Sequence, residues 1–115
     1  MSIIKDINLA PSGEMKINWV ERNMPVRRGI GRRFSEEKPF KGLKVALSVH
    51  LEAKTAYLCR VMEMGGAEMY VTGSNPLSTQ DDVAAALAAG GMNVFAEYGC
   101  TEQQYEDCLR EVLKI

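Results

Sequence analysis

Hydrophobic positions from residue 44 onward alternate between two patterns. Short apolar runs at residues 45–49, 68–72 and 92–96 have the length and composition of buried parallel strands. Each run is followed by a segment with helical spacing, and glycine pairs at 65–66 and 90–91 end the first two of these helices. The order is therefore βαβαβα with short connections. Right-handed crossovers make such a chain a parallel sheet with helices packed on its faces.

The three helices differ in how clearly their faces are marked. Residues 52–64 are apolar nearly all round, and the alanine-rich second helix has Ser78 or Thr79 as its expected cap. Asp81 and Asp82 fall in the first turn of that helix, where the helix dipole favours anions. The last helix has the clearest period, and its apolar face is expected to hold Tyr105, Cys108, Leu109, Val112 and Leu113.

The beginning of the chain follows a different pattern. Apolar positions in residues 15–23 predict a modest helix with Ser12 as its candidate cap. The Met-Pro pair that follows either breaks this helix or opens a second one, because proline suits the first turn. The sequence thus predicts a single Rossmann/flavodoxin-like α/β domain, in which a helical N-terminal arm (1–43) precedes an α/β unit (44–115).

Composition and charge narrow the range of partners. The chain of 115 residues suits one small domain, and its net charge of -1 creates no global field that favours nucleic acid or an acidic membrane. Residues 1–43 hold nine Lys/Arg and five Asp/Glu (+4), whereas residues 44–115 hold five and ten (-5). No apolar run approaches the roughly 20 residues of a membrane helix. Three cysteines without paired spacing favour reduced thiols in a cytoplasmic protein.

Polar residues follow the first two predicted strands at the edge where parallel sheets bind ligands. His50, the only histidine, stands just past the first strand, with Glu52 and Lys54 in the helical turn after it. The loop after the second strand carries five polar residues, namely Ser74, Asn75, Ser78, Thr79 and Gln80. A lone histidine is more often structural than functional, and helix capping explains one or two of the loop residues. Capping does not explain all five, so this edge is the candidate site.

Several kinds of site are not indicated. Gly29 and Gly31 form a glycine pair, but residue 34 is Phe34 and the pair precedes a strand, so the dinucleotide-binding pattern fails. His50 has no metal-ligand spacing to the cysteines, so no metal site is expected. The residues by themselves leave three classes open: a piece of an enzyme, a small-ligand binding module, or a protein-interaction domain.

Four segments together resemble the start of S-adenosylhomocysteine hydrolases. They are residues 6–10 (DINLA), 24–25 (MP), 50–56 (HLEAKTA) and 74–82 (SNPLSTQDD). Their order and spacing agree across essentially the whole chain, and the last segment is the strongest signal. The resemblance implies that the chain is the first part of the family's substrate-binding domain.

The family's reaction is what the resemblance implies for a complete enzyme. A tightly held NAD oxidises the ribose 3′-hydroxyl, homocysteine is eliminated from the 5′ position, water adds, and the hydride returns. The NAD-binding domain of such an enzyme would lie beyond Ile115, so no cofactor is expected for this chain alone. The implied partners are the nucleoside thioether substrate and the remainder of the enzyme, in cis or in trans. A complete enzyme is expected to be a homo-oligomer, with no nucleic acid or membrane as partner.

Residue roles carried over from the resemblance centre on His50. This residue matches a family histidine near the reacting end of the ribose, with a proposed proton-transfer role. Glu52, Lys54 and Thr55 fall where the family contacts the nucleoside. The loop that lines the homocysteine side of the pocket corresponds here to Asn75, Ser78, Thr79 and Gln80.

Two positions depart from the common family form, H-M-T-x-E/Q-T-A. Glu52 replaces a ligand-binding threonine and Lys54 replaces the Glu or Gln, as in a bacterial and archaeal branch of the family. Family chains are also several times longer. The leading hypothesis is therefore a substrate-binding fragment of a hydrolase for S-adenosylhomocysteine or S-inosylhomocysteine, inactive alone. The alternatives are a stand-alone binding or assembly domain of the same descent, and an unrelated flavodoxin-like interaction module.

Overall fold

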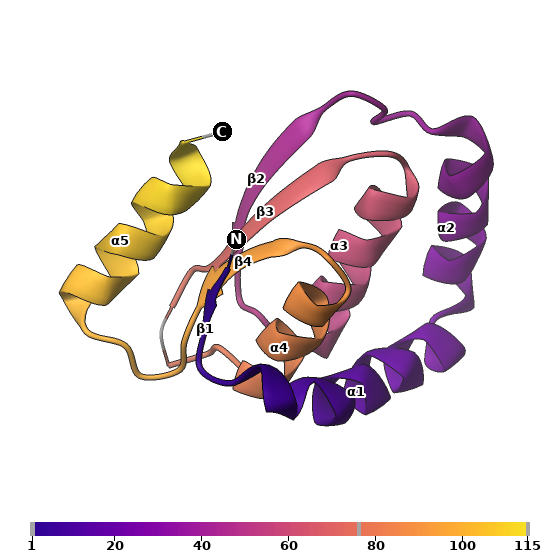
Figure 1. The fold of residues 1–115 in the computed structure, drawn as a ribbon. Helices are drawn as coiled ribbons and strands as arrows, with labels where there is room; N and C mark the ends of the chain where they lie inside the picture. Colours follow the sequence, from indigo (N-terminus) through magenta and orange to yellow (C-terminus); the bar gives the residue numbers. More distant parts are fainter. Residues whose placement is uncertain (1, 76, 115) are drawn as a thin grey trace.

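A four-stranded parallel sheet with strand order β1-β4-β3-β2 forms the centre of the molecule (Figure 1). The computed structural model describes residues 2–75 and 77–114. The strands are β1 (Ile3–Ile4), β2 (Lys44–Val49), β3 (Glu68–Gly73) and β4 (Asn93–Ala96). The α/β class and the parallel sheet that the sequence predicts are confirmed.

The strand β1 is an addition that the sequence pattern did not predict. Its two residues pair with the end of β4, with Ile3 opposite Phe95 and Ile4 opposite Ala96. The Ser2 side chain extends this pairing, since its Oγ accepts a hydrogen bond from the backbone N–H of Val94 at 2.9 Å. Two residues are too few to show the alternation that marks a strand. The N-terminal segment therefore contributes to the sheet as well as to the helices.

The helices lie in two unequal layers. They are α1 (Ala10–Asn23), α2 (Pro25–Glu37), α3 (Ala53–Met64), α4 (Asp81–Ala89) and α5 (Glu102–Leu113), with a short 3-10 turn η1 (Ile7–Leu9) before α1. Figure 1 shows α1 to α4 on one side of the sheet and α5 alone on the other. The larger layer encloses the main core, to which α1 contributes Ile17 and Val20. In the smaller layer, the hydrophobic cluster among the described residues consists of Phe95, Cys108 and Val112.

Two helices begin at other residues than their expected caps indicate. The helix α1 begins at Ala10, so Ser12 lies inside its first turn, and the Ser12 hydroxyl donates to Asp82 Oδ2 at 2.7 Å. The helix α4 begins at Asp81 with Gln80 as the flanking residue, so neither Ser78 nor Thr79 caps it. Both of those side chains are used within the preceding loop instead, where they contact Asn75.

The side of the sheet that faces α5 is only partly covered. Cys108 and Val112 are buried there, as the helical period predicts, but Leu109 is half-buried and Leu113 remains 75% exposed. The outer strand β2 alternates between exposed and half-buried residues and has no fully buried one. One helix covers a narrow strip of a four-stranded sheet, so part of the apolar face of α5 stays exposed. The apolar residues of β2, Val45, Leu47 and Val49, pack on the other side of the sheet against the main core.

The helices α1 and α4 meet at a glycine. A Cβ atom placed on Gly13 would lie 1.9 Å from the carbonyl oxygen of Asp82 and 2.9 Å from the Ala86 Cβ. Only a residue without a side chain permits this approach. The contact fixes α1 beside the start of α4, where the loop from β3 ends.

No helix within the described ranges is long and apolar enough to cross a lipid bilayer.

Candidate functional site

The carboxyl ends of β2 and β3 bring the two predicted site segments together. The backbone N–H of Ser74 donates to the Val49 carbonyl at 2.8 Å, and that of Gln80 donates to the Leu51 carbonyl at 3.0 Å. These two bonds tie the start and the end of the loop after β3 to the segment after β2. His50 therefore lies beside the 74–80 loop, although 24 or more residues separate them in sequence.

His50 takes part in a short hydrogen-bond chain. Its Nδ1 lies 2.7 Å from Ser78 Oγ, and Ser78 Oγ donates to the Asn75 carbonyl at 2.9 Å. A hydroxyl has one proton to donate. Because the Ser78 proton is directed to Asn75, His50 Nδ1–H is the donor to Ser78 Oγ. The neutral ring then carries its proton on Nδ1 and an acceptor lone pair on Nε2, the arrangement needed for taking up a proton.

The hydroxyl of Thr55 holds the segment that carries His50. Thr55 Oγ1 donates to the His50 carbonyl and accepts from the backbone N–H of Glu52 at 3.1 Å. The side chain thus closes the turn between β2 and α3 from inside the first turn of the helix. In this structure Thr55 contacts the backbone around His50, and it supports the position of the histidine.

The other predicted loop residues occupy different environments. Thr79 is 4% exposed, and its side chain is enclosed beneath the loop near Gly73. Asn75 is exposed, and its Oδ1 accepts from the backbone N–H of Leu77 at 2.9 Å, which forms an Asx turn. Asn75 and Thr79 therefore stabilise the loop, whereas Ser78 contacts His50.

The remaining predicted residues line a hollow between α1 and the starts of α3 and α4. Its volume is about 440 Å³, within the usual range for small-ligand pockets of about 300–1,000 Å³. Glu52, Lys54 and Gln80 line this hollow from the ligand-binding edge of the sheet. His50 is not among the lining residues. The structure thus divides the predicted site residues between a histidine centre and an adjacent hollow.

Four residues of α1 complete the hollow, and the sequence alone did not single them out as site residues. They are Met15, Lys16, Trp19 and Val20. Met15 is 74% exposed and Trp19 is 58% exposed, so two large apolar side chains of α1 remain accessible beside the hollow. The sequence shows that these residues share a helix, but not which loop the helix faces.

Among the residues that the structure describes, this edge shows neither a cluster of metal ligands nor the glycine-rich turn of a dinucleotide site after β1 or β2. Among residues 2–75 and 77–114, no group of three His, Cys, Asp or Glu side chains converges as metal ligands would. NAD needs a glycine-rich turn that lets the backbone approach its pyrophosphate. The turn after β2 reads His50, Leu51, Glu52 and has no glycine, and β1 is followed directly by Lys5 and Asp6. The residues around this edge do not fit NAD.

A parallel sheet with a histidine and a polar loop at its carboxyl edge defines the protein as an α/β domain of the architecture whose members bind ligands at that edge. The family model for S-adenosyl-L-homocysteine hydrolase matches residues 1–115. The chain belongs to this family.

Archaeal members of the family are similar over nearly the whole chain. The S-inosyl-L-homocysteine hydrolase of Methanocaldococcus jannaschii is 54% identical over 110 residues, which cover 96% of this chain and 26% of that protein. The adenosylhomocysteinase of Thermococcus kodakarensis is 51% identical over 112 residues, covering 97% and 27% respectively. The S-inosyl-L-homocysteine hydrolase of Methanococcus maripaludis is 50% identical over 113 residues, covering 98% and 27%. The chain therefore spans about a quarter of the length of these relatives.

Proposed function

We propose that these residues form the first part of the substrate-binding domain of a longer hydrolase. The helical segment 1–43 and the α/β unit 44–115 act together in this domain, because the hollow is lined from both. The complete enzyme would split the thioether of S-inosylhomocysteine or S-adenosylhomocysteine. Water contributes a hydroxyl to C5′ of the nucleoside and a proton to the homocysteine sulfur, which balances the reaction. We place this protein in the cytoplasm, acting as a homo-oligomer.

The observation that carries this proposal is the hydrogen-bond chain of His50, Ser78 and Asn75. It holds an imidazole at the ligand-binding edge with Nδ1 bonded to Ser78, so that in the neutral ring Nε2 is the acceptor. A proton must leave and re-enter the ribose during elimination and hydration, and a positioned imidazole can carry it. NAD would bind elsewhere in the longer protein, because the residues at this edge do not fit it.

The test compares the 115-residue chain with the full-length protein that carries it. Homocysteine release is followed with a thiol reagent, with each of the two nucleoside thioethers as substrate and NAD supplied. We expect release by the full-length protein and none above background by the 115-residue chain. The absence of release from the full-length protein with both thioethers would refute the proposed function.

Base preference is expected to depend on Lys54, which the family resemblance places near the purine 6-position. An ammonium group donates hydrogen bonds and accepts none, so it suits the 6-oxo group of hypoxanthine and not the 6-amino group of adenine. In the full-length protein, Lys54→Glu should lower the ratio of kcat/KM for the inosyl over the adenosyl substrate. An unpaired buried polar group costs about 1–3 kcal/mol, which corresponds to a factor of about 5–150.

The control for this prediction is Lys41→Glu, which makes the same charge change at an exposed residue that does not line the hollow. Its ratio should equal that of the wild type. A Lys54→Glu protein with an unchanged ratio would show that Lys54 does not read the base.

A further inference from the structure

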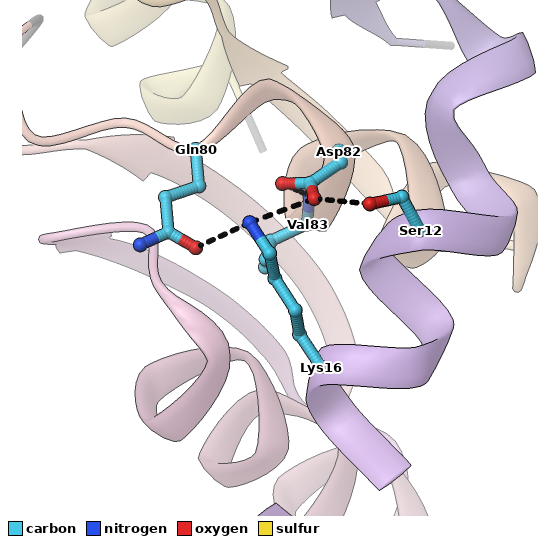
Figure 2. Close-up of polar contacts among 5 residues, drawn as sticks. All are labelled: Ser12, Lys16, Gln80, Asp82 and Val83. Atoms are coloured by element: carbon cyan, nitrogen blue, oxygen red, sulfur yellow. Dashed lines mark hydrogen bonds and ion pairs between the residues drawn. The ribbon is translucent and has the colours of Figure 1, made fainter. Parts of the chain in front are cut away.

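Lys16 connects α1 to the last residues of the candidate site. Its ammonium lies 2.8 Å from Asp82 Oδ2 and 3.3 Å from Gln80 Oε1 (Figure 2). Ser12, one turn earlier on α1, donates to the same Asp82 oxygen at 2.7 Å. Lys16 of α1 thus contacts both Asp82, in the first turn of α4, and Gln80, the residue just before that helix.

The contact with Lys16 determines which way the Gln80 amide is turned. An ammonium has three donor hydrogens and no acceptor, so the amide atom facing it must be the oxygen. The amide nitrogen Nε2, with two N–H groups, then points away from Lys16, as Figure 2 shows. Within the described part of the chain, Gln80 Nε2 donates to no protein group. Gln80 is exposed and lines the hollow, so these N–H groups are accessible to a ligand.

The position of Lys16 is itself restrained by Asp82. Burial acts to raise the pKa of the Asp82 carboxyl, but the hydrogen bonds from Lys16 and Ser12 outweigh it and hold the pKa below its ordinary value. Asp82 is therefore ionised at neutral pH and keeps the ammonium beside Gln80. Asp82 Oδ1 in turn accepts from the backbone N–H of Val83 at 2.9 Å, which fixes the carboxylate to α4.

We propose that Lys16 is a positioning residue that fixes the Gln80 amide as a hydrogen-bond donor to an acceptor oxygen of the substrate. This inference rests on the proposed function, in which Gln80 contacts the substrate. It adds Lys16 of α1 to the residues that act on the substrate. It also requires that the ligand group opposite Gln80 accept a hydrogen bond. A ligand group that can only donate does not fit opposite Gln80 while Lys16 is in place.

The test is a double-mutant cycle in the full-length protein, with Lys16→Met, Gln80→Ala and the double variant. Without Lys16 the amide can rotate, and we expect KM to rise about 2–12-fold, the equivalent of one hydrogen bond of about 0.5–1.5 kcal/mol. kcat should change little, because binding that is equal in the ground and transition states affects KM alone. The double variant should be no worse than Gln80→Ala, and Lys16→Arg should restore KM.

Two further variants separate positioning from a structural role. Gln80→Glu retains the contact with Lys16 but replaces the N–H donor by an acceptor, so its KM should rise at least as much as that of Gln80→Ala. Asp82→Asn weakens the link between the helices, and its effect on the unfolding free energy should persist in the Gln80→Ala background. Additive effects of Lys16→Met and Gln80→Ala on KM would refute the role of Lys16 while leaving the proposed function intact. A wild-type full-length protein that hydrolyses neither thioether would refute both.

Discussion

Replacing His50 with alanine in the full-length protein is expected to lower kcat by about 10²–10⁴-fold, the usual loss when a general acid–base group is removed. The structure supports a proton-transfer role because Ser78 accepts from Nδ1 and so leaves Nε2 as the proton acceptor. The measurement is the initial rate of homocysteine release at saturating substrate. Alanine at this exposed position removes no core packing, so the folded structure should persist.

The matched control is Ser78→Ala, which retains the imidazole but removes the group that sets its tautomer. We expect a smaller loss of kcat than for His50→Ala. In the double variant, Ser78→Ala should add nothing, because its effect acts through the histidine. An unchanged kcat in His50→Ala would assign His50 a structural role only.

Replacing Gly13 with alanine is expected to destabilise the protein by about 3 kcal/mol, the upper part of the range for overpacked cores. The added Cβ would lie 1.9 Å from the backbone carbonyl oxygen of Asp82, and a backbone atom cannot move aside as the end of a side chain can. The helix α1 would have to shift away from α4. The unfolding free energy from urea titration, followed by circular dichroism, measures this loss.

The sign of the change in unfolding free energy distinguishes close packing from helix propensity. Alanine is favoured over glycine in the interior of a helix by about 1 kcal/mol, so helix propensity alone predicts stabilisation. Gly29→Ala in α2 provides the control, because its added Cβ would meet no atom within 4 Å. We expect Gly29→Ala to stabilise by about 0.5–1 kcal/mol. Equal effects of the two substitutions would contradict the close contact of α1 and α4.

The sequence by itself determined the elements from residue 44 onward and the edge at which the candidate site lies. The apolar runs and helical periods are local signals, set by residues a few positions apart. The placement of His50 and the 74–80 loop at one edge follows from the parallel order of two consecutive strands. The helical period correctly placed Cys108 and Val112 in the buried face of α5.

The tertiary structure alone decided how the N-terminal segment meets this unit. The pairing of Ile3 with Phe95 joins residues more than 90 positions apart, and the approach of Gly13 to Asp82 joins residues 69 apart. No local period encodes such contacts, because they depend on the shape of surfaces that form only when the elements pack. The same packing brings Lys16 to Gln80 and places Trp19 on the hollow. The exposure of Leu113 on α5 was also decided by the tertiary structure. The period of a helix shows which face is apolar, but not how much of that face a neighbouring element covers.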